Sequence, residues 1–293
     1  HAQTNDDSRF HLKTHMNQKL SGKVALITGG ARGLGRGYAL HLANLGADIV
    51  IIDRNLKAAD VYEFERELLS AETVMAECEN LGVRAMGVEI DLCDRAVTET
   101  AVGDIIGKLG QIDIAICNAG GGTVIFADEI DAEEEALDIN TTGTPANCNE
   151  EMQIRVLNNN LMTCMYTCMA VAPYMKRQKS GKIITVSSSA GMDAKVDAKG
   201  YHPYGLAKSA IIYYTRSLAL ELAPHNINVN CIAPCIIRTG RLGDRAHLAK
   251  HIPLGREGTI EDCAKVVEFL ATDLSDYVTA HTIPIDGGVI GIS

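Results

Sequence analysis

The feature that most restricts the fold of this chain is a regular alternation of short apolar runs with longer amphipathic stretches, beginning at Lys23. Such runs are typical of strands buried on both faces, and the stretches between them are long enough for helices. Parallel strands need a connection of a dozen or more residues, which a helix usually supplies. The alternation predicts an α/β fold, a doubly wound parallel sheet of the Rossmann type with helices on both faces.

The expected elements follow one another without an internal repeat. Strands are expected at residues 24–27, 48–52, 85–90, 112–117, 182–186, 228–232 and 282–284. Helices are expected at residues 36–44, 71–80, 95–108, 153–176, 204–222 and 260–271. Residues 1–19 are polar and aperiodic, so we interpret them as a disordered arm or a cloning remnant and expect a single domain over residues 20–293.

Two connections are longer than a compact α/β domain usually carries. Residues 54–69 are acidic, which favours a solvated helix, because a run of charge usually faces water. Residues 123–151 are also acidic and are interrupted by Gly143 and Pro145. This second insertion is interpreted either as a lid beside the functional site or as an element that contacts a partner or another subunit.

Charge and cysteine content exclude several classes of protein. The net charge of −10 argues against nucleic acid as a partner, and no run approaches the roughly 18 apolar residues of a membrane helix. The nine scattered Cys residues favour reduced thiols in the cytoplasm over a disulfide framework. Cys164 and Cys168, like Cys231 and Cys235, are spaced four apart without a matching second pair, so we interpret them as buried thiols and expect no metal.

A glycine-rich turn at residues 28–35 is the first motif with chemical content. It follows an expected strand and opens an expected helix. Without a Cβ, Gly29, Gly33 and Gly35 allow a tight turn, close approach of a diphosphate and close packing of helix on strand. The start of the helix adds unpaired N–H donors, so the motif predicts a dinucleotide site.

Asp53 lies 18 positions after Gly35, at the end of the second expected strand. A carboxylate here accepts hydrogen bonds from the adenosine ribose and repels a 2′-phosphate, which favours NAD over NADP. Arg32 and Arg54 point the other way, because either guanidinium can pair with a phosphate. The choice between the two cofactors therefore rests mainly on Asp53.

Tyr204 and Lys208 share one face of an expected helix, because they are spaced i and i+4. A phenol exchanges protons poorly near neutral pH, and a neighbouring ammonium favours the phenolate. The pair is therefore interpreted as a tuned acid/base.

With these motifs the chain resembles the short-chain dehydrogenases/reductases of the ordinary, non-extended type over roughly residues 19–290. The shared signatures occur in the family's order: residues 28–35, Asp53, Asp91-Leu92, Asn118-Ala119-Gly120, Asn160-Leu161, residues 187–191, Tyr204/Lys208, residues 234–239 and residues 286–288.

The resemblance implies a catalytic tetrad. Tyr204 would exchange the proton with the substrate oxygen, and Lys208 would bind the nicotinamide ribose and assist Tyr204. Ser188, in the Ser-x-x-Gly register before Gly191, would hold the substrate oxygen. Asn160 would position a water in the proton relay, with Asn159 as the alternative. The implied cofactor contacts are Gly29, Arg32, Gly33, Leu34, Gly35, Asp53, Asp91, Leu92, Asn118, Ala119, Gly120, Tyr204, Lys208, Pro234, Ile237 and Thr239.

The sequence also departs from the family pattern. Ser188 and Tyr204 are 16 positions apart, so residues 192–203 are expected to bulge beside the substrate. Cys235 follows Pro234 where a glycine is usual, and Ala280-His281 replaces the usual glycine near the last strand. Both replacements raise the question of backbone strain.

Together these residues predict a nicotinamide-dependent oxidoreductase that interconverts a secondary alcohol and a ketone with NAD. One alternative is an NADPH-dependent carbonyl reductase of the 3-oxoacyl type. Another, from a different class, is a nucleotide-binding regulator without turnover. The family resemblance implies a homotetramer with residues 289–293 near a subunit contact. The residues identify no single substrate.

Overall fold

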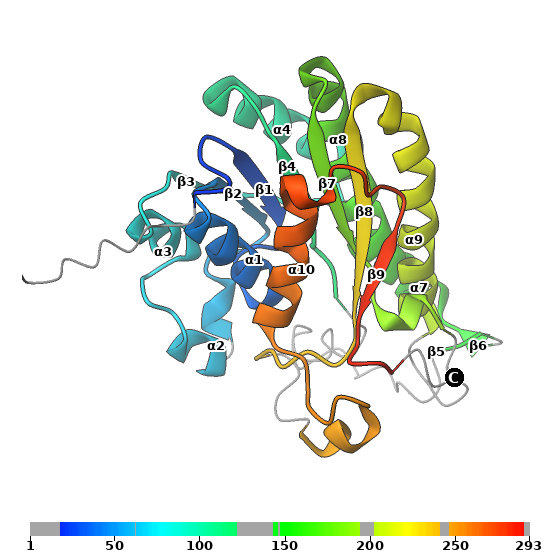
Figure 1. Cartoon of the computed structure of the whole chain (residues 1–293). Coiled ribbons are helices and arrows are strands. Elements are labelled where there is room, and N and C mark those ends of the chain that lie inside the picture. The colour runs from blue at the N-terminus through cyan, green and yellow to red at the C-terminus, as the bar shows by residue number, and fades with distance from the viewer. Residues whose placement is uncertain are drawn as a thin grey trace, which may run out of the picture.

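A seven-stranded parallel sheet forms the centre of the protein (Figure 1). The computed structural model describes residues 18–61, 63–121, 143–145, 147–193, 202–240 and 246–289. The strand order is β3-β2-β1-β4-β7-β8-β9, and each neighbouring pair is parallel. The predicted fold class is confirmed. The strand bounds are β1 Val24–Thr28, β2 Asp48–Asp53, β3 Ala85–Glu89, β4 Ile114–Cys117, β7 Gly181–Val186, β8 Ile227–Pro234 and β9 Thr282–Ile285.

Helices connect consecutive strands of this sheet. The helical bounds are α1 Gly33–Asn44, η1 Ala58–Val61, α2 Glu63–Glu67, α3 Val74–Asn80, α4 Arg95–Leu109, α7 Glu150–Leu157, η3 Asn158–Met162, α8 Thr163–Gln178, η4 Ser189–Gly191, α9 His202–Leu222, η5 Ala223–His225, η6 Ala246–His251, α10 Ile260–Ala271 and η7 Asp273–Ser275. Two further strands, β5 Gly143–Thr144 and β6 Asn147–Cys148, pair antiparallel. None of the described helices combines the length and apolar character needed to cross a bilayer.

The sheet separates two hydrophobic cores, because successive side chains of a strand point to opposite faces. On one face Ile27 and Ile51 pack with α1, α3 and α10. On the other, Leu26 and Ile52 pack with α4, α8 and α9. Figure 1 shows α1 and α10 in front of the sheet and α8 behind it. Burial of the central strands on both faces explains their nearly continuous apolar sequence.

The helix expected at residues 153–176 is interrupted by a π turn. Helix α7 passes through η3, a wider turn of five residues, into α8. Inside this turn the Asn160 side chain donates to the Val156 carbonyl over 3.0 Å. The side-chain amide thus supplies a hydrogen-bond donor to a backbone carbonyl near the point where the regular α-helical hydrogen bonding is interrupted.

A buried ion pair joins α1 to α3. Arg36 donates two hydrogen bonds to the Glu77 carboxylate, over 2.7 and 2.6 Å, and a third to the Leu68 carbonyl over 2.8 Å. Glu77 also accepts from the backbone and the hydroxyl of Ser70, both over 2.8 Å. Burial alone would raise the pKa of Glu77, but the hydrogen bonds from Arg36 and Ser70 lower it below its usual range.

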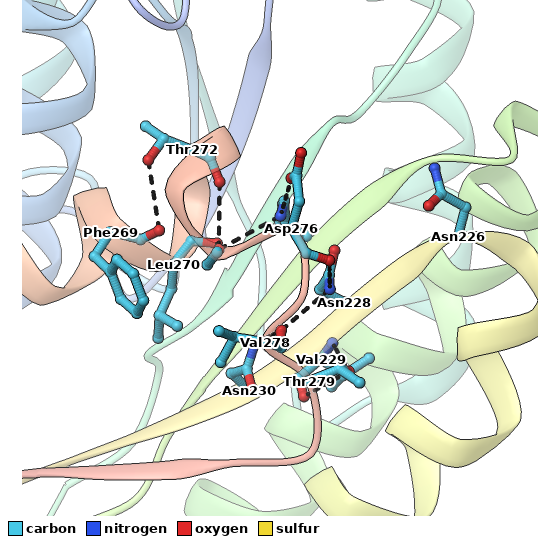
Figure 2. A network of polar contacts seen from close by, with 12 residues as sticks. Asn226, Asn228, Val229, Asn230, Phe269, Leu270, Thr272, Asp276, Val278 and Thr279 are labelled. Atoms are coloured by element: carbon cyan, nitrogen blue, oxygen red, sulfur yellow. Dashed lines mark hydrogen bonds and ion pairs between the residues drawn. The ribbon is translucent and has the colours of Figure 1, made fainter.

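Ala280 adopts a left-handed backbone, with φ of 66°, where relatives of this type were expected to carry glycine. The loop before it is fixed to β8 by asparagine side chains (Figure 2). Asn228 and Asn230 both donate to the Val278 carbonyl, over 3.1 and 2.8 Å, and Asn230 also accepts from the His281 backbone. This network holds the strained residue in place. Cys235 does not have a positive φ, so a cysteine in place of glycine causes no such strain there.

Several predicted segments lie outside the described residues: 1–17, 122–142, 146, 194–201, 241–245 and 290–293. The arm, most of the second insertion, most of the bulge before Tyr204 and the terminal tail therefore stay predictions. The single domain is part of the confirmed fold class, whereas its bounds at residues 20 and 293 stay predictions.

Candidate active site

The glycine turn lies between β1 and α1, as predicted. Gly29 and Gly33 have positive φ of 63° and 54°. A Cβ on Gly35 would collide with the Gly29 carbonyl oxygen and would lie 2.7 Å from the Asn118 amide nitrogen. No described side chain caps the start of α1, whose N-cap residue is Arg32. The turn therefore presents bare main chain and helix N–H groups, which suit a diphosphate.

Asn118 braces this turn from the end of β4. Its side-chain nitrogen donates to the Thr28 and Gly29 carbonyls, over 3.1 and 3.0 Å. In return the Thr28 hydroxyl accepts from the backbone N–H groups of Asn118 and Ala119, each over 3.0 Å. These bonds connect β1 and β4, the strands between which the order of the sheet reverses.

Asp53 ends β2 beside the same turn. One carboxylate oxygen accepts from the Ala31 backbone over 3.1 Å, and the other accepts from the Asn55 backbone over 3.3 Å. Burial raises the pKa of Asp53, against the lowering effect of these hydrogen bonds and of the Arg32 charge. A partly desolvated acceptor in this position suits the hydroxyls of a ribose.

Helix α9 places Tyr204 and Lys208 together. The Lys208 ammonium lies 5.5 Å from the centre of the Tyr204 ring, and it donates to the Val186 carbonyl over 2.9 Å. Lys208 is 4% exposed, so its charge is held at the carboxyl end of β7 rather than in bulk water. Pro203, in the first turn of the helix, suits a position whose N–H has no intrahelical partner.

The three serines after β7 have different roles in the structure. Ser187 is buried and donates to the Lys208 carbonyl over 2.8 Å, so it anchors α9. The Ser188 hydroxyl caps η4 by accepting from the Ala190 backbone over 3.3 Å, and Ser188 is only partly buried. Ser189 is buried within η4. Ser188 is therefore the serine whose hydroxyl is both held in place and partly accessible to a substrate.

Asn160 lies in the π turn and is fully buried. Its side chain accepts from the Gly121 backbone over 3.0 Å and donates to the Gly121 carbonyl over 2.9 Å. Its neighbour Asn159 instead accepts from the thiol of Cys93, away from this loop. Since η3 and η4 both pack against α9, the structure brings Asn160 and Ser188 to the helix of Tyr204.

The remaining predicted contacts follow the carboxyl ends of other strands. Leu92 is buried after β3, whereas its neighbour Asp91 is exposed. Pro234 ends β8, and Ile237 is buried where it bridges to Gly258. Of the other positions from the prediction, Leu34 and Thr239 are partly buried and Gly120 is exposed. All described members of the predicted site therefore lie along one edge of the sheet.

Glu65 is a residue beside the site that the sequence did not indicate. The first insertion was expected to be a solvated helix, and most of α2 is exposed, but Glu65 is only 6% exposed. Its carboxylate accepts from the Gly240 backbone over 3.2 Å and lies 3.5 Å from where a Cβ of Gly33 would be. The expectation was therefore wrong for this residue, because a tertiary contact buries it.

Comparisons with known proteins agree with this geometry. A family model described as "Enoyl-(Acyl carrier protein) reductase" matches residues 29–290. The cyclohexanol dehydrogenase of Rhodococcus sp. (strain TK6) is 46% identical, over 93% of this chain and 98% of that protein. A 3-oxoacyl-[acyl-carrier-protein] reductase of Chlamydia pneumoniae is 34% identical, over 94% and 99%. The crystal structure of NAD⁺-bound xylitol dehydrogenase aligns with a TM-score of 0.76 at 26% identity, covering 92% of this chain and 100% of that one.

A doubly wound sheet with a glycine turn at its reversal point and a Tyr–Lys pair beside it defines an oxidoreductase of the Rossmann class. The chain belongs to the short-chain dehydrogenase/reductase family. The predicted family and enzyme class are confirmed: the protein is a short-chain oxidoreductase that uses a nicotinamide cofactor and a small-molecule substrate.

Proposed function

We propose that the protein interconverts a cyclic secondary alcohol and its ketone, with NAD as the cofactor. The observation that carries this proposal is the buried Lys208 ammonium beneath the Tyr204 ring, on a helix packed between the turns of Ser188 and Asn160. The cyclic character of the substrate is supported by the cyclohexanol dehydrogenase that shares 46% identity. Because cells generally keep NAD oxidised, alcohol oxidation is the proposed direction.

Tyr204 exchanges the proton with the substrate oxygen. The Lys208 ammonium, 5.5 Å from the centre of the Tyr204 ring, offsets the negative charge that develops on the phenol oxygen during this transfer. The Val186 carbonyl orients that ammonium, which leaves donors on Lys208 for a ribose hydroxyl. Lys208 therefore acts both on the phenol and on the position of the cofactor.

Ser188 and Asn160 complete the proton path. The Ser188 hydroxyl, fixed at the start of η4, donates to the developing charge on the substrate oxygen. Asn160 uses its side chain to fix the Gly121 backbone, and its own carbonyl, which accepts from the Thr163 hydroxyl over 3.2 Å, keeps a second lone pair for a water in the relay to Lys208. The proton then leaves through Lys208 to solvent.

The residues present fit a dinucleotide. Gly29, Gly33 and Gly35 would receive the diphosphate, and Asp53 would hold the adenosine ribose. When bound, the nicotinamide supplies the hydride chemistry. The proposed preference for NAD rests on Asp53, since a 2′-phosphate would meet its partly buried carboxylate. Initial rates with NAD and NADP test this preference, and a faster rate with NADP in the wild-type enzyme would refute it.

Tyr204→Phe tests the catalytic assignment. Turnover should fall by about 10²-fold or more, because the phenol oxygen is the proton donor and acceptor. NAD binding, measured by isothermal titration calorimetry, should change little. Tyr213→Phe is the matched control on the same helix, because Tyr213 is 74% exposed and lies outside the site. Wild-type activity in Tyr204→Phe would support a nucleotide-binding regulator instead.

The substrate class is tested with two assays run side by side. The first follows NADH formation from cyclohexanol and NAD. The second follows NADPH consumption with a 3-oxoacyl thioester, which is the reaction that the 34% identical relative suggests. Higher kcat/KM in the first assay supports the proposal, whereas higher kcat/KM in the second establishes the carbonyl reductase alternative.

We also infer that the enzyme forms a homo-oligomer, with a tetramer as the specific proposal. Leu206, Tyr213 and Leu220 recur every seven residues on α9 and are 42%, 74% and 75% exposed. A helical stripe of this kind suits an isologous contact between two copies. Leu220→Glu should therefore reduce the assembly measured by analytical ultracentrifugation, and an unchanged sedimentation coefficient would remove this support.

A further inference from the structure

Three cysteine thiols meet in the hydrophobic core between β4 and α8. Cys117 ends β4, and Cys164 and Cys168 occupy successive turns of α8. All three side chains are fully or almost fully buried, at 2%, 2% and 0% exposure. Their sulfur atoms all lie within 4.8 Å of one another, and those of Cys117 and Cys168 are 3.5 Å apart. Two elements distant in the sequence thus converge on one point.

The spacing of these sulfur atoms matches a metal-thiolate site. Zinc–sulfur bonds are about 2.3 Å long, so two thiolates on one ion lie roughly 3.8–4.0 Å apart. The observed spacings, 3.5 Å between Cys117 and Cys168 and at most 4.8 Å for the other pairs, lie on either side of that geometry. The i,i+4 spacing of Cys164 and Cys168 also holds two ligands on one helical face without backbone rearrangement.

We propose that Cys117, Cys164 and Cys168 form a closed binding site for one thiophilic divalent cation of the Zn²⁺ or Cd²⁺ type. Sulfur ligands select soft cations over Mg²⁺ or Ca²⁺. Binding converts three thiols to thiolates and releases three protons to solvent, and no electron is transferred. From the sequence alone Cys164 and Cys168 were expected to be ordinary buried thiols, because the contribution of Cys117 depends on packing.

The charge of the filled site is balanced by Lys208. Three thiolates and a divalent cation carry a net charge of −1, which is costly in a buried position unless an opposite charge is near. The Lys208 ammonium binds the Val186 carbonyl, one residue along β7 from Thr185, which is the register partner of Cys117. Its positive charge therefore lies on the strand next to the site, where it can offset the negative charge of the metal-thiolate group.

Occupancy of this site should inhibit the enzyme. Cys117 directly precedes Asn118, which braces the glycine turn, and Cys164 follows Asn160 by one helical turn. Drawing three sulfur atoms onto an ion shifts both supports and redirects the Lys208 charge toward the thiolates. This loss of turnover rests on the catalytic roles proposed above, whereas metal binding is independent of them.

The test is titration of the reduced, full-length protein with Cd²⁺ in the presence of a competing chelator. The readouts are the ultraviolet thiolate-to-cadmium charge-transfer band and the metal content after gel filtration. We expect one Cd²⁺ per chain and affinity lowered about 100-fold or more in Cys164→Ala and in Cys168→Ala. Cys263→Ala is the matched control, because Cys263 is equally buried but lies on α10, in the opposite core.

Turnover is followed in the same titrations. It should fall in step with occupancy in wild type and in Cys263→Ala, but not in Cys168→Ala. The proposal would be overturned if Cys164→Ala kept the full wild-type charge-transfer band. It would also be overturned if the band disappeared on replacing the three partly exposed cysteines, Cys93, Cys148 and Cys235. X-ray absorption of the Cd²⁺-loaded wild-type protein decides independently of the variants: three sulfur ligands support the site, and a shell of oxygen or nitrogen refutes it.

Discussion

Replacing Glu77 by Gln removes one charge from the ion pair that joins α1 to α3. The Glu77 side chain is 1% exposed and that of Arg36 is 15% exposed, so the remaining guanidinium stays largely out of water. Breaking a buried pair in this way costs about 3–5 kcal/mol. Because Arg36 keeps its hydrogen bond to the Leu68 carbonyl, we expect a value near the lower end, about 3 kcal/mol.

Urea unfolding followed by circular dichroism measures this loss, with Glu72→Gln as the control. Glu72 pairs with Lys57 over 3.0 Å, but the two side chains are 81% and 60% exposed. Such a surface pair contributes roughly 0–1 kcal/mol, so its loss should change the unfolding free energy little. Replacing both partners of the buried pair, as in Arg36→Met with Glu77→Leu, should recover most of the loss.

The pH dependence supplies the refuting result. Since the pKa of Glu77 is lowered in the folded protein, its ion pair stabilises fully above the unfolded carboxyl pKa of about 4.3. This contribution is lost as the pH falls through the lower, folded value. The difference between wild type and Glu77→Gln should therefore shrink below about pH 4. A difference below 1 kcal/mol at pH 7, or one that is unchanged at pH 3, would contradict this reasoning.

Three further changes test the backbone and the cofactor crevice. Gly35→Ala should abolish measurable NAD binding, because the added Cβ would collide with the Gly29 carbonyl. Gly107→Ala is the control, because its Cβ would meet nothing within 4 Å. It should leave NAD binding intact and stabilise α4 by about 0.5–1 kcal/mol in thermal unfolding. Ala280→Gly should stabilise the protein by about 0.5–1 kcal/mol by relieving a left-handed alanine, and a lower melting temperature would refute this. Because burial raises the pKa of Asp53, calorimetric NAD affinity should weaken on acidification above the usual aspartate range; Asp53→Asn should lack this dependence.

The parts of the site that the sequence predicts depend on local spacing. The glycine turn lies between β1 and α1 because a strand period and a helix period meet there. Lys208 lies under Tyr204 because a separation of four residues places side chains on one helical face. The central strands were predicted within a few residues, because burial on both faces gives them continuous apolar sequences.

The parts that the sequence does not predict depend on which elements pack together. Glu65 resembles its exposed acidic neighbours until α2 meets the loop at Gly240. Cys117 lies 47 positions before Cys164, and only the packing of α8 on β4 brings their sulfur atoms together. Hydrophobic periodicity likewise predicts one continuous helix through Asn160, because a single π turn changes the apolar pattern too little to be recognised.

The π turn also lets one long helical rod hold an additional residue without changing the direction its faces point. An i→i+5 turn takes about one residue more than an α turn to complete the same rotation, so the core-facing sides of α7 and α8 stay aligned across it. Deleting one residue between Asn158 and Met162 should therefore leave a regular α-helix in which α8 still faces the sheet, while Asn160 loses the position from which it contacts Gly121. The additional residue thus serves the placement of one side chain and not the packing of the rod.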